Sequence, residues 1–300
     1  MGAASLVIEY EYRGGRVSER RSEESAKAFM LGGGAGIYTA MRTVCGGQRV
    51  FLLDDHLQRI VDSHRAVLAG GPANDAAHWR ALLVPLLRRG LQQVRHGESK
   101  ITVLVGADGV RIQFAPLLQA QPGRPCWVRF ASGHREHPEA KSLQWVHERE
   151  ALERLIVPPV DDVVLVDDAA AAAPRFYEGT SSNFFVVRRV ARGRQPEFRD
   201  FELLAAPLDC VLLGTVMRLV LRICRRDGIP VVHDGGASAA GMADWAGAFI
   251  SSTSRLVLPV ERILYGAAGQ CHHALDPANA LVTHLQHSVL SMAEEQSSAV

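Results

Sequence analysis

A short polar segment, YEGTSSNFFVV over residues 177–187, holds a concentrated set of side chains that can do chemistry. The carboxylate of Glu178, a glycine and four small polar residues lie between two stretches with strand composition, DDVVLVDD before and NFFVV after. Small polar side chains often bind their own backbone in tight turns, so this cluster by itself is typical of an ordinary loop. Whether the cluster forms a functional site depends on the rest of the chain.

Chemistry that needs an amine has three candidates, because lysine occurs only at Lys27, Lys100 and Lys141. Lys27 lies in a polar N-terminal stretch and Lys100 opens a charged turn, so we expect a solvated surface position for both. Lys141 alone would also be interpreted as an exposed lysine at the start of a helix.

Two other features of the sequence do not indicate a functional site. The glycine-rich run at residues 32–36 does not follow the GxGxxG pattern of a nucleotide-binding βαβ unit, and the residues after it indicate a strand. His134, His137, His272 and His273 do not recur with cysteines or carboxylates at a metal-ligand spacing, so we expect no metal site.

Composition excludes several classes of protein. The chain has 300 residues, 47% hydrophobic and 22% charged, which predicts a folded, soluble protein of two modest domains or one large one. The net charge of +1 provides no field that would attract nucleic acid or an anionic membrane, and no apolar stretch predicts a membrane helix. The expected partner is a small molecule or another protein.

Cysteine usage indicates the compartment. Five cysteines without a Cys-x-x-Cys pair argue against a disulfide framework and a zinc ribbon. A reducing compartment fits, and we expect the cytoplasm, with an organelle left open.

The positions of glycine- and proline-rich turns divide the chain into segments and predict two domains. Residues 1–118 indicate a small N-terminal α+β domain. A strand at 6–12 opens a hairpin that turns at Gly14-Gly15, and a second hairpin covers 100–114. Strands are expected at 37–44 and 49–53, and helices at 56–69 and about 76–96. The polar run QAQPGRP predicts a linker at 119–125. Residues 126–300 indicate a larger α/β domain in which strands and helices alternate. It would have helices near 142–155, at 215–227 and at 276–300, the last ending in a polar tail.

The sequence resembles the class IV, fold type IV, pyridoxal-phosphate aminotransferases, a group with D-amino acid aminotransferase, branched-chain aminotransferase and aminodeoxychorismate lyase. Separate segments carry the resemblance in family order: GAGIYTAMRT with DDHLQRIVDS, AKSLQWVHEREALE, YEGTSSNFFVV, and APLDCVLLGTVMR with FISSTSRLVLPV. The resemblance implies a two-domain fold of mixed α+β and α/β character, the cofactor in the cleft between the domains, and a homodimer.

The resemblance assigns the reactive groups. Lys141 is the only lysine in a family motif, and a lysine must hold pyridoxal phosphate as an imine and then move the substrate α-proton. Glu178 matches the carboxylate that keeps the pyridine nitrogen of the cofactor protonated. Ser182 and Asn183 of the same motif are implied to bind the cofactor.

Phosphate needs cations and amides. Arg59 in HLQR matches the family's phosphate-binding arginine. Gly214, Thr215 and Val216 open the helix expected at 215–227, whose N-terminal amides favour an anion. Ser252 and Thr253 match a hydroxyl pair that completes the phosphate-binding site in D-amino acid aminotransferase.

The substrate side departs from the family in places. Tyr38 and Arg111 match substrate-facing residues of the D-amino acid enzymes, but Gln113 replaces a histidine and leaves the stereochemistry open. Val146 replaces a tyrosine of the branched-chain enzymes, so this region is more similar to the D-amino acid branch. Leu213 and Ala205 replace a usual proline and threonine in a loop.

Three functions are compatible with these residues. The leading one is transfer of an amino group between an amino acid and a 2-oxo acid, with branched-chain amino acid aminotransferase activity as an alternative. A lyase that eliminates pyruvate to leave 4-aminobenzoate would use the same residues. A dimer without turnover is disfavoured because Lys141, Glu178 and Arg59 are all present.

Overall fold

The chain forms two compact units. A computed structural model describes residues 5–68, 75–94, 97–117, 124–167, 174–191, 196–233, 237–266 and 271–300. Unit 1 contains Met1–Gln119, Glu139–Glu148 and Met292–Val300, and unit 2 contains Ala120–Pro138 and Arg149–Ser291. Most of the linker expected at 119–125 lies outside the described residues, and the boundaries expected for the domains stay predictions. The segment around Lys141 belongs to unit 1.

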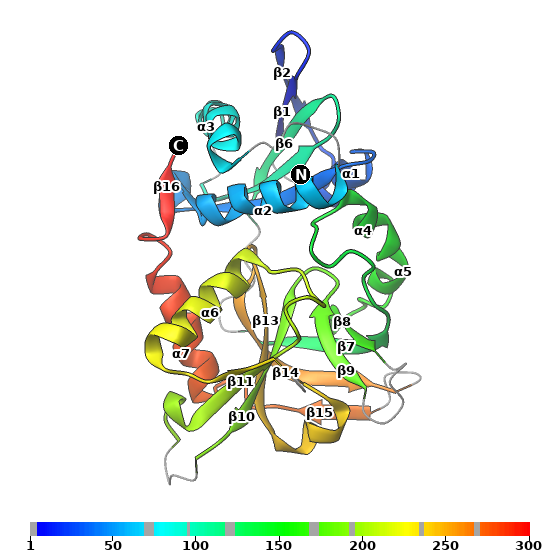
Figure 1. Cartoon of the computed structure of the whole chain (residues 1–300), viewed down its shortest axis with the longest axis vertical. Coiled ribbons are helices and arrows are strands. Elements are labelled where there is room, and N and C mark those ends of the chain that lie inside the picture. The colour runs from blue at the N-terminus through cyan, green and yellow to red at the C-terminus, as the bar shows by residue number, and fades with distance from the viewer. Residues whose placement is uncertain are drawn as a thin grey trace. The chain divides into compact units, whose positions relative to one another are not determined.

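Unit 1 is built on an antiparallel sheet, seven-stranded within the described residues. The hairpins expected from the sequence are confirmed as the pairs β1–β2 and β5–β6. In spatial order the strands are β16 (Ser297–Ala299), β4 (Arg49–Phe51), β3 (Ile37–Val44), β5 (Ser99–Val105), β6 (Gly109–Pro116), β1 (Ser5–Glu11) and β2 (Val17–Ser22) (Figure 1). A short 3₁₀ turn, η1 (Cys45–Gly47), joins β3 to β4.

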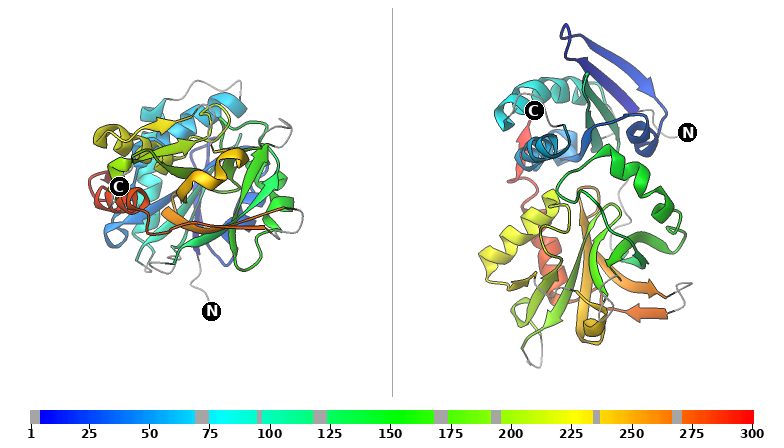
Figure 2. Two further views of the ribbon diagram at one scale, coloured as in Figure 1. Left: turned by 90° about the horizontal axis from the view of Figure 1, so that it is seen from below. Right: turned by 45° about the vertical axis from the view of Figure 1, so that its right-hand side comes forward.

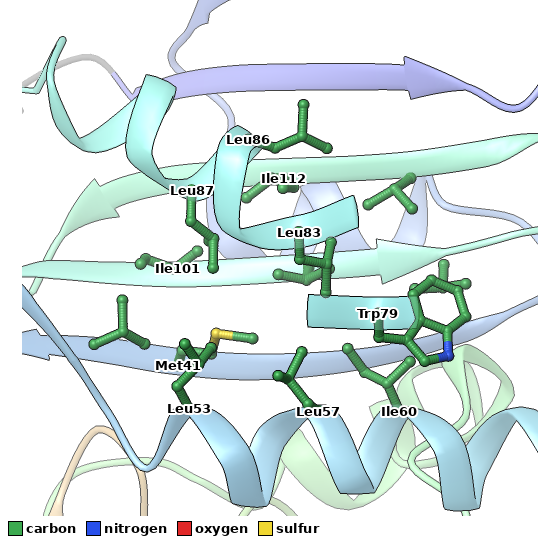
Figure 3. Packing of buried hydrophobic residues seen from close by; sticks show 14 of the residues in the cluster. Met41, Leu53, Leu57, Ile60, Trp79, Leu83, Leu86, Leu87, Ile101 and Ile112 are labelled. Carbon is green, nitrogen blue, oxygen red and sulfur yellow. The ribbon is translucent and has the colours of Figure 1, made fainter. Parts of the chain in front are cut away.

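Two helices cover one face of this sheet. Helices α2 (Leu53–Val67) and α3 (Ala76–Leu91) confirm the helices expected near these positions. Leu57 on α2 and Leu83 on α3 pack with Ile101 and Ile112 of the sheet in one buried cluster (Figure 3). Full burial of one such side chain contributes about 1.5–3 kcal/mol, so this cluster holds α2 firmly against β3.

The opposite face of the sheet packs against α1 (Ala26–Leu31) and α4 (Leu143–Glu148). Successive strand residues point to opposite faces, so Ile37 joins the α2 side and Tyr38 joins a cluster with Phe29, Leu104 and Leu143. The beginning of β3 therefore contributes side chains to both layers.

Unit 2 is built on a mixed sheet, nine-stranded within the described residues. Its path is β12 (Val231–Val232), β11 (Phe201–Ala205), β10 (Asn183–Arg189), β13 (Trp245–Ser252), β14 (Leu256–Tyr265), β7 (Cys126–Ser132), β8 (Val160–Asp167) and β9 (Arg175–Gly179), with β15 (Cys271–Ala274) beside β14. A pairing of β9 with β10 closes six of these strands into a ring.

The alternation of strands and helices expected beyond residue 126 is wrong. No helix is described between β8, β9 and β10, or between β13, β14 and β15. Most of these neighbours are antiparallel, and antiparallel strands need only short connections. Among the strands that the structure describes, parallel pairing is confined to β7 with β8, β7 with β14, and β11 with β12.

The helices of unit 2 are α5 (Glu150–Glu153), α6 (Thr215–Asp227) and α7 (Ala280–Ser291), with 3₁₀ turns η2 (Phe198–Asp200) and η3 (Ala239–Asp244). Helices α6 and α7 lie side by side and pack against β13 (Figures 1 and 2). The bounds expected for α6 are confirmed. No helix in the described ranges is long and apolar enough to span a membrane.

Two expected helices are wrong in extent. The helix expected near 142–155 is split into α4 and α5 at Arg149, whose buried side chain donates to the carbonyl of Thr180 at 3.0 Å. The helix expected over 276–300 ends at Ser291. Ser297–Ala299 then forms β16 on the edge of unit 1, where the Arg49 side chain donates to the Ser297 hydroxyl at 2.8 Å.

Candidate active site

Lys141 is held by its own backbone at the start of β3. The amide of Tyr38 donates to the carbonyl of Lys141 at 2.9 Å, and the amide of Leu143 donates to the carbonyl of Gly36 at 2.8 Å. The amide of Lys141 donates to the hydroxyl of Ser63 on α2 at 3.0 Å. The Lys141 Nζ lies 4.6 Å from the centre of the Tyr38 ring. Both ends of the peptide are thus fixed, and the amine faces the aromatic ring.

Arg59 and Lys141 both lie near a buried histidine that the sequence analysis missed. Arg59 and His56 are both on the buried face of α2, and the Thr39 hydroxyl lies 2.7 Å from Nδ1 of His56. Burial, and then the positive charges of Arg59 and Lys141, hold the pKa of His56 well below 6.5. A neutral histidine therefore lies beside two cations. The only signal in the sequence was its place in the HLQR motif.

The expected substrate residues lie on the same face of the sheet as Tyr38. Tyr38 pairs with Leu104, and Leu104 pairs with Arg111, so Arg111 is two strands from Tyr38. The Nε of Arg111 donates to Glu9 at 3.2 Å, its Nη1 donates to the carbonyl of Gly32 at 3.0 Å, and its guanidinium lies over the ring of Phe29. Arg111 is therefore charge-paired within unit 1.

Gln113 is buried and ties the N-terminal strand to the start of α1. Its Nε2 donates to the hydroxyl of Ser5 at 3.3 Å and to the carbonyl of Glu24 at 2.9 Å. These bonds give Gln113 a structural role in the folded chain. Substrate binding by Tyr38, Arg111 and Gln113 stays a prediction.

In unit 2, Glu178 is buried near the end of β9. Its Oε2 accepts the amide of Leu212 at 3.2 Å, and its Oε1 lies 3.6 Å from Nη1 of the buried Arg135. A buried carboxylate beside a guanidinium is stabilised as the anion. An anion suits the role expected for Glu178, which is to keep the ring nitrogen of the cofactor protonated. No motif around Arg135 predicted this contact.

Asn183 stands opposite Glu178 across the β9–β10 pair and binds the same residue, Leu212. Its Nδ2 donates to the carbonyl of Leu212 at 2.7 Å. A Cβ atom at Gly214 would lie 2.1 Å from Oδ1 of Asn183, so any larger residue there would force Asn183 or the start of α6 to move. Asn183 therefore fixes the loop that leads into α6.

Helix α6 begins without a side-chain cap. Gly214 is the N-cap residue and makes no side-chain capping bond, so the first amides of this 13-residue helix have no cap from it. The hydroxyl of Thr215 lies 3.4 Å from that of Thr253, and Val216 follows in the buried first turn. Four of the expected phosphate-binding residues thus meet at one place: Gly214, Thr215, Val216 and Thr253.

Two other expected residues have hydroxyls bound within unit 2. Ser182 donates to the carboxylate of Asp162 at 2.8 Å, and Ser252 accepts the amide of Arg255 at 3.3 Å. Asp162 was not expected from the sequence. Among the described residues, no group of three or more histidine, cysteine, aspartate or glutamate side chains could hold a metal ion.

The model of the class IV amino-transferase family matches residues 36–263, and the chain belongs to this family. Class IV aminotransferases are pyridoxal-phosphate enzymes, so this chain is an aminotransferase that uses that cofactor. No curated protein sequence gives a significant match.

Solved structures show the same fold. A putative branched-chain aminotransferase from Thermotoga maritima is 21% identical, with a TM-score of 0.68 over 95% of this chain and 96% of that one. A branched-chain aminotransferase from Thermoproteus uzoniensis is 19% identical, with a TM-score of 0.68 over 98% and 97%. An aminotransferase from Brucella abortus with bound pyridoxal phosphate is 17% identical, with a TM-score of 0.67 over 97% and 100%.

The residues present fit pyridoxal phosphate. Unit 1 by itself offers an amine at Lys141, and unit 2 by itself offers a buried carboxylate at Glu178 and a helix N-terminus without a side-chain cap at α6, which are the kinds of group that this cofactor needs.

Proposed function

We propose that this aminotransferase moves an amino group between an amino acid and a 2-oxo acid, with Lys141 as the catalytic lysine. The observation that carries the proposal is the fixed peptide of Lys141, whose amine faces the Tyr38 ring. The bound cofactor supplies an electron sink for the carbanion at the substrate α-carbon.

Each residue has a separate task in this proposal. Lys141 binds the cofactor through Nζ and, once released by the substrate, takes the α-proton at the same atom. Glu178 keeps the ring nitrogen protonated, and the amide of Leu212 holds the carboxylate in one orientation. Arg59, the first amides of α6 and Thr253 bind the phosphate.

For the substrate, two classes of amino acid are proposed as candidates. Branched-chain aminotransferases are among the structural neighbours, which supports a branched-chain amino acid as one candidate. The family segments at Tyr38 and Val146 support the D-amino acid branch as another. We also propose a homodimer in a reducing compartment, supported by the family resemblance and by the free thiols at Cys45, Cys126, Cys210 and Cys224.

A substrate panel tests the proposal. Purified enzyme with pyridoxal phosphate is mixed with single D- or L-amino acids and either 2-oxoglutarate or pyruvate, and the new amino acid is measured by chromatography. Aminodeoxychorismate is included, and release of pyruvate and 4-aminobenzoate from it would replace transamination by the lyase. Lys141→Ala should abolish turnover and lose cofactor on dialysis, whereas Lys27→Ala should keep both. Transamination at the wild-type rate by Lys141→Ala would contradict the assignment.

A further inference from the structure

Asp162 is a fully buried carboxylate on β8 that none of the proposed chemical steps uses. An ionised carboxylate in a protein interior is costly unless it is paired and hydrogen-bonded. Its surroundings in unit 2 therefore show what it stabilises.

Both oxygens of Asp162 are saturated. Oδ1 accepts the hydroxyl of Thr180 at 2.7 Å and the amide of Val163 at 2.9 Å. Oδ2 accepts the hydroxyl of Ser182 at 2.8 Å, that of Ser181 at 3.3 Å and Nη1 of Arg255 at 2.7 Å. A carboxylate offers about four acceptor positions, so this cluster leaves no unused capacity.

The three hydroxyls belong to one turn, residues 179–183, which joins Glu178 to Asn183. The amide of Thr180 donates to the carbonyl of Val163 at 2.8 Å, which places the turn directly over β8. A Cβ atom on Gly179 would lie 2.3 Å from Oγ of Ser182 and 3.0 Å from Oδ2 of Asp162. The turn therefore packs on Asp162 as closely as its backbone permits.

Arg255 connects the same carboxylate to a second turn. Its Nη2 donates to the carbonyl of Asp161 at 3.0 Å, and its amide donates to Oγ of Ser252 at 3.3 Å. Thr253, in this turn, faces Thr215 at the start of α6. Asp162 thus links the turn next to Glu178 with the turn that carries Thr253.

We infer that Asp162 is a positioning residue that holds these two turns in the geometry that binds the phosphate and ring of the cofactor. The inference rests on the proposed function, because it assigns Glu178 and Thr253 to cofactor binding. Asp162 itself touches neither the cofactor nor the substrate. It acts through the hydroxyls of the 179–183 turn and through Arg255.

The test compares Asp162→Asn with Asp161→Asn, the same change at the neighbouring position on β8. Dissociation constants for pyridoxal phosphate are measured by titrating each apoprotein, and apoprotein melting temperatures are recorded beside them. Asp162→Asn should bind the cofactor on the order of 10- to 100-fold more weakly, the range for lost hydrogen bonds to a charged group. Asp161→Asn should remain within about twofold of wild type, a shift small beside one tenfold step.

A double variant separates positioning from simple ion pairing. Asp162→Asn leaves the partly exposed Arg255 without its carboxylate partner, and adding Arg255→Gln removes the unpaired charge. The double variant should regain melting temperature while its cofactor affinity stays low, because the amide NH2 introduced by Asp162→Asn cannot accept the hydroxyls of Ser181 and Ser182 that Oδ2 of Asp162 accepts. Recovery of wild-type affinity, or unchanged affinity in Asp162→Asn, would overturn the inference.

Two further outcomes are also decisive. If Asp162→Asn does not fold, the test uses Arg255→Gln instead. This variant keeps the bonds between Asp162 and the 179–183 turn, and it breaks the side-chain bond that joins Asp162 to the turn at residues 252–255. Its cofactor affinity should fall about fivefold or more, and wild-type affinity would overturn the inference. If wild-type protein itself binds no pyridoxal phosphate, the proposed function fails first, which the wild-type titration shows separately.

Discussion

The carboxylate of Glu178 accepts the main-chain amide of Leu212 at 3.2 Å, although 34 positions separate them in the chain. This bond orients the carboxylate and also holds the loop that begins α6. Asn183 donates to the carbonyl of the same residue at 2.7 Å. Glu178, proposed to bind the ring nitrogen, and the start of α6, proposed to bind the phosphate, are therefore both held by Leu212. A change in one should alter the position of the other.

Glu178→Gln should keep the cofactor and lose the rate. The glutamine has nearly the same shape and can still accept the Leu212 amide, but it does not hold a proton on the ring nitrogen. We expect kcat to fall by about two orders of magnitude or more, with cofactor affinity changed by only a few-fold. Glu202→Gln, another buried glutamate paired with an arginine in unit 2, is the matched control and should keep its rate. An unchanged kcat in Glu178→Gln would remove Glu178 from the site.

Arg59→Ala should weaken cofactor binding without changing the chemistry. Phosphate is remote from the bonds that change, so its contacts are equal in ground and transition states. Loss of one charge-assisted bidentate contact costs about 2–4 kcal/mol, or on the order of 30- to 1,000-fold in affinity. Excess pyridoxal phosphate should restore much of the rate, and it should not rescue Lys141→Ala. The exposed Arg65 on the same helix provides the control, Arg65→Ala. A titration in which Arg59→Ala binds as tightly as wild type would refute its placement.

Gly214→Ala should damage the phosphate site through a single methyl group. The new Cβ atom would lie 2.1 Å from Oδ1 of Asn183, so Asn183 or the start of α6 must move. We expect cofactor affinity to fall roughly tenfold or more, the cost of losing one phosphate contact. Gly106→Ala, where the nearest atom is 3.8 Å away, should bind the cofactor normally. Equal affinities for the two variants would show that the cradle at Gly214 has no part in binding.

Stability should fall in acid because of His56. Burial, and then the charges of Arg59 and Lys141, keep its native pKa well below 6.5, whereas in the unfolded chain it titrates near 6.5. Below that pH the unfolded chain binds a proton that the native chain excludes, so the free energy of unfolding decreases by up to about 1.4 kcal/mol per pH unit. Urea unfolding at pH 7.5 and 5.5 should show a smaller loss for His56→Gln than for wild type. His64 and His273, whose pKa values burial also lowers, should account for part of the remaining loss.

The exposed His287 gives the control for this pH dependence. His287→Gln should lose as much stability between the two pH values as the wild-type protein does. If His56→Gln also loses the wild-type amount, His56 is not the group that titrates.

The sequence by itself determined the elements whose signals are local. The bounds of α6, the hairpins β1–β2 and β5–β6, and the helical period of α2 follow from residues only a few positions apart. It also indicated the family, which the match over residues 36–263 confirms, and the family motif assigns Lys141 as the catalytic lysine, which stays a prediction.

Only the tertiary structure decided which distant groups meet. The residues around Ser297 were expected only as a polar tail at the end of a helix, and instead they form an edge strand bound to Arg49, 248 positions away. Arg135 beside Glu178, and Asp162 beneath the 179–183 turn, carry no local signature, since an arginine or aspartate looks the same in sequence whether solvated or buried. Periodicity records which face of an element is apolar, but the partner of a buried charge is set by how the strands pair and close, which no short window contains.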